Sequence, residues 1–264
     1  MKITVRDVVG SLLISDKPLI DSVDQLLIGC YDEEVRGIAT TFAATCEVIE
    51  KASNLGVNLL ISHEGIYYSH QNNPEWLAAD PVCSRKRQII EQTGIAIYRD
   101  HDHCHRQTPD IIMAGLLEAL DWENAVAEML STSAIVQVAP IKLQQLAAYI
   151  KTKLGLHYVR VTGQLSDCCS HIGILVGYRG GGSLAIPLLR DKGVDVIIAG
   201  EGPEWETPEY VRDAVHQGGH QALITLGHAE SEQPGMQYLA KQLQKQYPQI
   251  PVHFLPVDPL FHVL

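Results

Sequence analysis

The sequence predicts an α/β protein in which helices flank largely buried sheets. Three observations support this fold class. Helical and strand patterns alternate along the chain rather than occurring in runs of one kind. Several helical patterns end at a glycine, and an apolar run of strand length follows directly. These runs, for example residues 57–62, lack the polar alternation of a half-exposed strand and are typical of strands buried on both faces.

The individual elements follow from their end signals. Thr4 and Asp7 form a capping-box-like start for a first helix that continues through Val8, Val9, Leu12 and Leu13. Further helical patterns cover residues 45–55, 85–93, 108–120, 142–154, 183–192, 208–217 and 233–246, with Thr108 and Pro109 expected as the start of the 108–120 helix. Strand patterns cover residues 57–62, 95–98, 158–161, 172–176, 194–198, 222–226 and 252–254. Glycines 56, 94, 155 and 193 end four of the helices.

An internal similarity indicates two related halves. Residues 55–65 align without gaps on residues 192–202 with five identities, and each segment is followed by a second strand and a histidine. We therefore predict one domain built of two α/β halves, about 1–128 and 129–264, with the last helix and strand able to pack back on the first half. The alternative is chance similarity, because glycine followed by aliphatic residues is common in buried strands.

Composition limits the possible partners. The chain has 20 lysines and arginines against 31 aspartates and glutamates, a formal net charge of -11, which argues against a nucleic-acid partner. Its 6 cysteines show neither paired metal-binding spacing nor the density of a disulfide scaffold, so we expect a cytoplasmic protein. No apolar run reaches the roughly 18 residues of a membrane helix, and no membrane partner is expected.

Histidine, with 12 copies, stands out in the composition, and three His/Glu clusters follow predicted strands. Ligands bind at the carboxyl ends of strands in open α/β sheets. Two of the clusters have the i, i+4 spacing that places both side chains on one helix face if the loop continues into helix. Four imidazoles and two carboxylates suffice for two divalent ions with positions left for water. The predicted metal ligands are His63, Glu64, His101, His105, His228 and Glu232.

Other interpretations of these residues remain open. Either His103 or Asp102 could replace a ligand in the 100–105 run, which is also consistent with a charged surface loop. Glu232 also suits a helix N-terminus through the helix dipole. The turn at residues 177–183, with glycines at 180, 181 and 182, fits a phosphate-binding loop less well than a simple tight turn. Glu201 and Tyr67 are weak candidates for proton transfer or substrate contact, and no dedicated catalytic base is identified.

The motifs Ser62-His63-Glu64, Arg99-Asp100-His101 and Gly227-His228-x-x-x-Glu232 resemble those of the NIF-three-like dinuclear metal-centre hexameric proteins. Some members are described as GTP cyclohydrolase I type II homologues. The resemblance implies two interlocked α/β halves with sheets flanked by helices, a metal site in the cleft between them, and a homohexameric ring.

This chain departs from the family pattern twice. The family typically has His-His where this chain has His63-Glu64, and His-x-x-x-Asp where it has His101-x-x-x-His105. The two changes compensate each other, because four imidazoles and two carboxylates remain. We hypothesise that Glu64 or Glu232 bridges the two ions.

The function predicted from the sequence is that of a dinuclear metal-dependent hydrolase. A small phosphorylated, nucleotide or cyclic-amide substrate, anionic in the first two cases, would be attacked by a metal-activated water. Zinc, iron, manganese and nickel all suit this ligand set, so two divalent ions per chain are expected without a fixed identity. The alternative is a non-catalytic ring protein that binds, delivers or senses metal.

Overall fold

The computed structural model describes residues 2–14, 19–71 and 75–264, which divide into two compact units. Unit 1 contains residues 1–112 and 235–258, and unit 2 contains residues 113–234 and 259–264. The chain passes from one unit to the other within two helices, α5 (Ile111–Ala119) and α9 (His228–Gln246), and again after Asp258. Each unit has its own mixed sheet flanked by helices, so the predicted α/β class is confirmed.

Unit 1 is built on a five-stranded sheet with the order β1-β4-β3-β2-β11. The strands are β1 (Gln25–Ile28), β2 (Ile38–Thr41), β3 (Leu59–Ser62), β4 (Ala96–Arg99) and β11 (Val252–Phe254). The other elements are α1 (Val5–Leu12), α2 (Cys46–Asn54), η1 (Glu75–Leu77), α3 (Pro81–Thr93) and α4 (Asp102–Arg106). The four strands β4, β3, β2 and β11 run parallel, and β1 pairs antiparallel at the edge.

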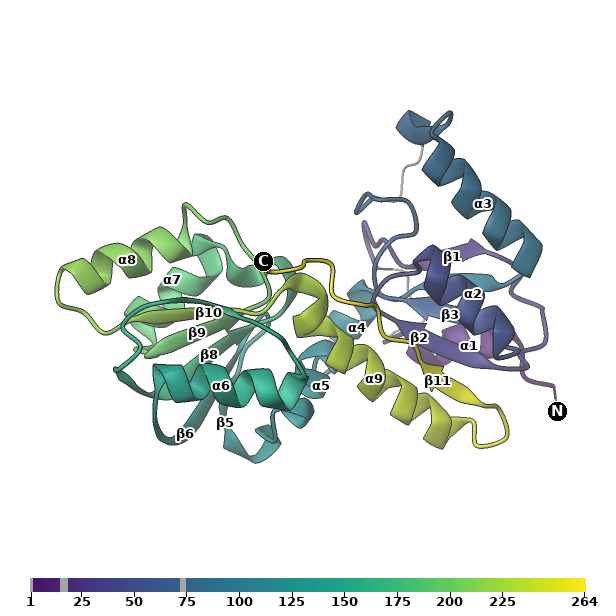
Figure 1. Cartoon of the computed structure of the whole chain (residues 1–264). Coiled ribbons are helices and arrows are strands. Elements are labelled where there is room, and N and C mark those ends of the chain that lie inside the picture. The colour runs from purple at the N-terminus through teal and green to yellow at the C-terminus, as the bar shows by residue number, and fades with distance from the viewer. Residues whose placement is uncertain (1, 15–18, 72–74) are drawn as a thin grey trace. The chain divides into compact units, whose positions relative to one another are not determined.

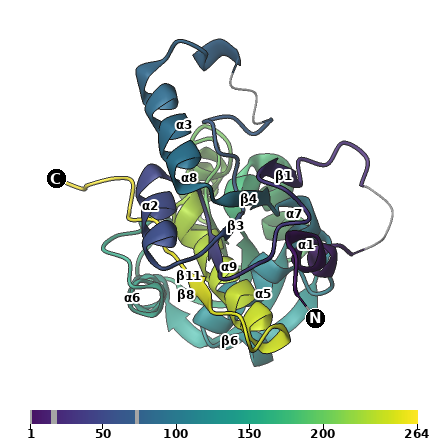
Figure 2. The ribbon, with the colours of Figure 1, turned by 90° about the vertical axis from the view of Figure 1, so that its right-hand side faces the viewer.

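Helices cover both faces of the unit 1 sheet. On one face, α2 and α3 pack on Ala39, Leu60 and Ile97 in a single apolar cluster. The alternate residue Thr40 points to the opposite face, where its hydroxyl donates to the Met236 carbonyl of α9 at 2.7 Å. Figure 2 shows α1 and α2 on opposite sides of β3 and β4. Both faces are therefore buried, as the continuous apolar runs predict.

Unit 2 contains a six-stranded sheet with the order β5-β6-β8-β9-β10-β7. The strands are β5 (Val126–Met129), β6 (Ala134–Lys142), β7 (Arg160–Thr162), β8 (Cys168–Leu175), β9 (Val196–Ala199) and β10 (Ala222–Thr225). The other elements are η2 (Glu123–Ala125), α6 (Leu143–Leu154), η3 (Gly177–Gly180), α7 (Gly182–Asp191) and α8 (Thr207–His216). Helices α7 and α8 cover one face of β8, β9 and β10, and α6 covers the other (Figure 1).

The two sheets repeat the same strand arrangement. In each, three parallel strands (β2, β3, β4 and β8, β9, β10) are followed by an antiparallel edge strand, β1 or β7. The glycine after each edge strand lies against the alanine that begins the neighbouring strand. A Cβ on Gly29 would be 2.6 Å from the Ala96 Cβ, and a Cβ on Gly163 would be 2.9 Å from the Ala222 Cβ.

The aligned residues Asn58 and Asp195 have the same structural role in the two units. The Asn58 Oδ1 accepts the backbone amides of Arg36 and Gly37 ahead of β2. The Asp195 Oδ2 accepts two successive amides at the start of β8, from Ser170 and His171. Shared contacts of this kind support relatedness over chance as the reason for the sequence similarity.

Several predicted boundaries differ from the observed ones. Helix α3 begins at Pro81 because the Asp80 carboxylate accepts the Cys83 amide, and α9 begins earlier than predicted, at His228. Helix α5 begins at Ile111 rather than at Thr108–Pro109, because the Asp110 carboxylate accepts the Ile112 amide and marks the start. Strands β1, β2, β5 and β6 were not predicted. Among the described residues, no helix has the length and apolar character needed to cross a membrane.

Lys86 of α3 is buried in unit 1, with 4% of its surface exposed. Its Nζ donates to the Ile66 carbonyl at 2.6 Å and lies 5.2 Å from the centre of the Tyr68 ring. Burial lowers the pKa of Lys86 from 10.5 to about 8. At pH values between these two pKa values, Lys86 is more protonated in the unfolded chain than in the folded chain. The contribution of Lys86 to stability therefore rises with pH.

We expect wild type to gain about 3 kcal/mol of stability relative to Lys86→Met between about pH 7 and about pH 10.5. Urea unfolding of both proteins at each pH measures this difference. Comparison with the variant cancels the contributions of other groups that titrate at high pH. Tyr98 is one of them, because burial raises its pKa. Parallel stability curves for the two proteins would contradict the prediction.

Candidate metal centre

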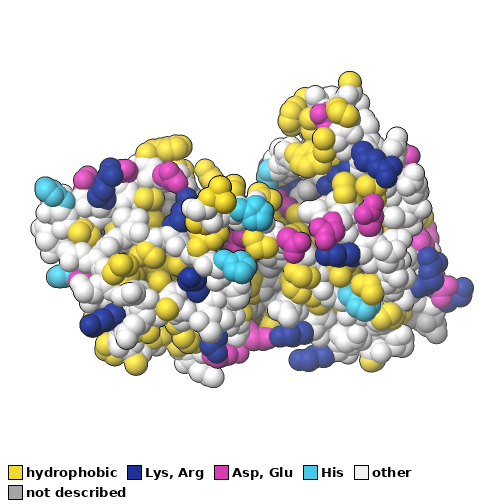
Figure 3. Space-filling view, viewed as in Figure 1, with side chains coloured by type: hydrophobic (Ala, Val, Ile, Leu, Met, Phe, Trp, Pro, Cys, Tyr) yellow, Lys and Arg dark blue, Asp and Glu magenta, His cyan; other side chains and the backbone are white. Residues whose placement is uncertain are grey.

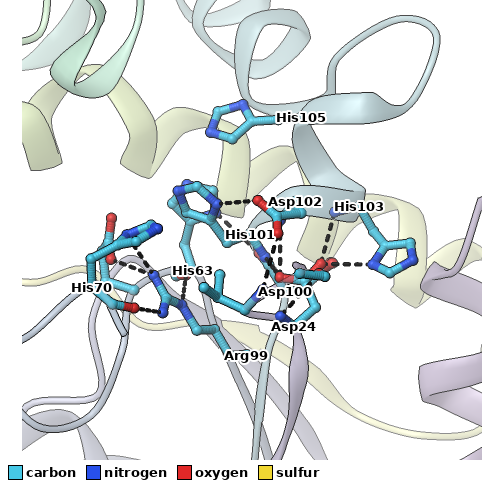
Figure 4. Close-up of polar contacts among 12 residues, drawn as sticks. Asp24, His63, His70, Arg99, Asp100, His101, Asp102, His103 and His105 are labelled. Atoms are coloured by element: carbon cyan, nitrogen blue, oxygen red, sulfur yellow. Dashed lines mark hydrogen bonds and ion pairs between the residues drawn. The ribbon is translucent and has the colours of Figure 1, made fainter. Parts of the chain in front are cut away.

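Three predicted ligands lie together in unit 1, past the carboxyl ends of two neighbouring parallel strands. His63 follows β3 and His101 follows β4, and Ser62 pairs with Arg99 at the strand ends. The ligand nitrogens of His63, His101 and His105 all lie within 4.8 Å of one another. The ring centres are 4.7 Å apart for His63 and His101 and 5.0 Å apart for His63 and His105. Figure 4 shows the three rings grouped around one space.

Helix α4 places His105 beside His101. The chain turns into helix directly after β4, and the His105 amide donates to the His101 carbonyl at 3.2 Å. Asp24, whose side chain is fully buried, holds this turn by accepting the amides of His101, Asp102 and His103. The expected placement of His101 and His105 on one helical face is confirmed.

Each of the three rings is oriented by a hydrogen bond at Nδ1. The partner is in every case a carbonyl or carboxylate oxygen, which accepts a hydrogen bond from Nδ1–H and leaves Nε2 as the atom able to bind a metal. The acceptors are the Asp100 carbonyl for His63 (3.0 Å), the Asp102 carboxylate for His101 (3.0 Å) and the Asp110 carboxylate for His105 (3.0 Å). This agreement among three side chains fits a metal site, because metal-binding histidines usually have such a partner.

The environment of His101 keeps its imidazole ring neutral. Burial, followed by the nearby His63, lowers the pKa of His101 to about 4. Its imidazole is therefore uncharged near neutral pH, which is the form that binds metal ions.

In unit 2, His228 and Glu232 form the first turn of α9. The His228 Nε2 lies 3.1 Å from the Glu232 Oε2, so the predicted i, i+4 pairing on one face is confirmed. The His228 Nδ1 is 2.9 Å from the Glu201 Oε1, which repeats the arrangement found for the unit 1 histidines. Glu232 is buried, with 2% of its surface exposed. The pair offers one imidazole nitrogen and one carboxylate on the same side of the helix.

The glycine-rich turn supports this pair directly. A Cβ on Gly177, whose φ is +58°, would lie 2.9 Å from the Glu232 Cδ and 3.2 Å from the His228 Nε2. Two amides of the turn have protein acceptors: Gly180 donates to the Glu201 carbonyl at 3.0 Å, and Gly182 donates to the Glu206 carboxylate at 2.7 Å. These contacts favour the tight-turn interpretation over a phosphate-binding loop.

Glu64 has an additional partner that the sequence does not reveal. Its Oε2 lies 2.9 Å from the Nη2 of Arg99, whose side chain is fully buried. Arg99 also donates to the carbonyls of His63, at 3.2 Å, and His70. Arg99 therefore fixes the segment that contains His63 and Glu64, and it shares the Glu64 carboxylate with any bound cation.

His103 and Asp102, the alternative ligands, both have structural partners. The His103 Nδ1 is 2.7 Å from the Asp24 Oδ2, and Figure 4 shows its ring directed away from His63 and His105. Asp102 contacts His101 and accepts the Val23 amide at 3.0 Å. Their contacts place them in the framework around the three imidazoles.

The candidate catalytic residues differ in position. Glu201 orients His228, as described above. Tyr67 belongs to the apolar core of unit 1, with 8% of its surface exposed, and its pKa is raised by burial. His70 was not singled out in the sequence, although its ring centre lies 5.1 Å from that of His101. Only its contact with Arg99, distant in sequence, could have indicated it.

Two mixed sheets flanked by helices, with imidazoles and carboxylates clustered beyond strand ends, define an α/β protein with a candidate metal centre. The family model described as Duf34/NIF3 (NGG1p interacting factor 3) matches residues 14–260. The chain belongs to this family, which confirms the resemblance noted in its sequence.

Individual relatives agree with this assignment. A protein named GTP cyclohydrolase 1 type 2 homolog from Clostridium perfringens is 23% identical over 221 residues, covering 79% of this chain and 78% of the relative. A protein of the same name from Clostridium acetobutylicum is 23% identical over 239 residues, covering 88% and 84%. The crystal structure of a Bacillus cereus protein related to NIF3 has a TM-score of 0.78 at 16% identity, with 100% of both chains covered, and shows the same fold.

Proposed function

We propose that the protein binds two divalent metal ions and is a hydrolase for a small phosphorylated, nucleotide or cyclic-amide substrate. The observation that carries this proposal is the common orientation of His63, His101 and His105. Each has Nδ1 hydrogen-bonded to an oxygen acceptor, and their ligand nitrogens lie within 4.8 Å of one another. Independent surface histidines have no reason to share this arrangement.

Each unit offers candidate ligands of its own. Unit 1 offers His63, His101 and His105, with Glu64 shared with Arg99, and unit 2 offers His228 and Glu232. Zinc, iron, manganese and nickel fit this mixture of nitrogen and oxygen ligands. Bound ions would supply Lewis acidity and lower the pKa of a coordinated water into the neutral range.

The surrounding carboxylates have a positioning role. Asp102, Asp110 and Glu201 each accept a hydrogen bond from a ligand histidine, which fixes the ring and raises the basicity of its other nitrogen. The Asp110 carboxylate holds His105 with one oxygen and begins α5 with the other, so the site is anchored to the helix framework.

The names of the two clostridial relatives support a nucleotide as the substrate class. Opening of a purine ring is a hydrolysis, and it needs an activated water and groups that stabilise a developing oxyanion. A nucleotide also carries phosphates that an electropositive metal centre attracts.

A non-catalytic metal-binding, metal-delivery or regulatory protein is the second candidate. The favouring observation is the ion pair between Arg99 and Glu64, because Arg99 withdraws negative charge from the cation. Such a site would bind metal more weakly and exchange it faster. Metal exchange without hydrolysis of nucleotides or phosphoesters would favour this candidate.

The first test is elemental analysis of the protein as purified, without added metal or chelator, for wild type and His228→Ala. We expect about two equivalents of divalent metal per chain in wild type and a loss of at least one in the variant. His216→Ala, an exposed histidine in the last turn of α8, is the matched control and should retain the wild-type content. Metal-free wild type that cannot be reloaded would contradict the proposed function.

A further inference from the structure

His70 differs from the other histidines of the cluster in the kind of partner it has. Its side chain is exposed, and both its carbonyl oxygen and its ring contact the buried Arg99. The His70 Nδ1 lies 3.2 Å from the Arg99 Nη2. Figure 4 shows His70 beside Arg99 and His63, on the side of the cluster opposite His103.

The partner determines where the ring proton of His70 lies. A guanidinium group can only donate hydrogen bonds, so the Nδ1 of His70 must accept. The proton of the neutral ring is therefore on Nε2. The carbonyl contact with the same guanidinium keeps the Nδ1 edge facing Arg99, because a flipped ring would present a carbon to the donor.

This tautomer is the reverse of the one found for His63, His101 and His105. Their Nδ1 atoms donate to oxygen, which leaves Nε2 to bind a cation. With its proton at Nε2, the neutral His70 ring donates there, although His70 also lies close enough to Glu64 and His101 to form a ligand group with them. A site of this composition therefore contains both metal ligands and a hydrogen-bond donor.

We propose that His70 donates a hydrogen bond through Nε2 to a phosphoryl oxygen of the ligand that binds at the metal centre. This inference rests on the proposed function, because the metal ions supply the main attraction for the anion. The positive charge of Arg99 behind the ring polarises the N–H bond and strengthens the donation. Glu64 balances the charge of Arg99. The exposed His70 ring contacts this ion pair through Arg99 and can donate to a ligand at the surface.

Two substitutions separate the roles of the two ring nitrogens. The amide nitrogen of His70→Gln reaches the place of Nε2 and keeps a donor there, whereas His70→Asn reaches only the place of Nδ1. With inorganic phosphate titrated calorimetrically into metal-loaded protein, we expect His70→Asn to bind about tenfold more weakly than wild type. We expect His70→Gln to remain within about threefold of wild type.

Two further measurements make the outcome decisive. Nitrogen NMR of the histidine rings in metal-free protein should show the Nε2–H form for His70 and the Nδ1–H form for His63 and His101. Elemental analysis should show unchanged metal content in both His70 variants. Equal phosphate affinity in all three proteins, loss of metal in His70→Asn, or an Nδ1–H form of His70 would each overturn the inference. If wild type holds no metal, the proposed function fails. If wild type holds metal but His70→Asn binds phosphate as tightly as wild type, only the inference about His70 fails.

Discussion

Replacing Gly177 by alanine is expected to weaken metal binding by at least about tenfold. The new Cβ would lie 2.9 Å from the Glu232 Cδ and 3.2 Å from the His228 Nε2, so the Glu232 carboxylate has to move. Glu232 is buried, which limits the places to which it can move while still facing His228. Metal titration of the chelator-treated protein measures the effect.

Gly193→Ala is the matched control for this variant. Its φ of +64° is close to the +58° of Gly177, but nothing lies within 4 Å of the new Cβ. Both variants should lose about 1 kcal/mol of stability from the left-handed backbone, and only Gly177→Ala should lose metal affinity. Equal metal affinity in the two variants would show that Gly177 has no role in positioning Glu232.

Replacing Arg99 by methionine is expected to destabilise the protein by about 3 kcal/mol. The change leaves the carbonyls of His63 and His70 without this donor and removes the charge partner of Glu64. Denaturant unfolding of the metal-free protein measures the loss. Arg6→Met is the control, because the ion pair of Arg6 with Asp32 is exposed on both sides and should contribute less than about 1 kcal/mol.

A double variant tests the cause of this loss. Adding Glu64→Gln to Arg99→Met removes the carboxylate that lacks its partner and should recover part of the stability. If the double variant is as unstable as the sum of the single changes, the Glu64 ion pair is not the source. The loss would then come from the two carbonyls.

The sequence predicted those elements whose signals are local. Thr4 and Asp7 form the capping box of α1, in agreement with the prediction, and Thr45 caps α2 at the predicted start of that helix. The missed strands are specified by tertiary contacts instead. β2 places Thr40 and Thr41 in full burial, and the Thr40 hydroxyl donates to the carbonyl of Met236, which is 196 residues away in sequence. β6 pairs irregularly with β8 around Pro140, which obscures its strand pattern.

The same distinction applies to the candidate site. His101, His105, His228 and Glu232 could be predicted because helical spacing and strand ends are visible in the sequence. Asp24, which accepts three amides at the start of α4, and His70, which is oriented by Arg99, could not be predicted. Both depend on residues brought together only by folding. Metal binding by the six predicted ligands stays a prediction until metal content is measured.

On the face drawn in Figure 3, lysine and arginine side chains are scattered singly or in small groups and do not form a continuous strip. Their distribution agrees with the acidic composition, 20 basic against 31 acidic residues. The local attraction for an anion proposed here would therefore come from the metal ions and from Arg99 with His70, rather than from the surface charge of this face.

The aligned residues Asn58 and Asp195 both accept backbone amides, but they are not interchangeable. Asn58 donates through Nδ2 to the Glu33 carboxylate and the Glu34 carbonyl, both at 2.9 Å, in addition to accepting backbone amides. Aspartate there would lose both donations and place a carboxylate against Glu33. Asparagine in place of Asp195 would still offer an oxygen to the β8 amides. The two exchanges are therefore expected to differ in effect: asparagine at position 195 should keep the amide contacts, whereas aspartate at position 58 would lose two donations.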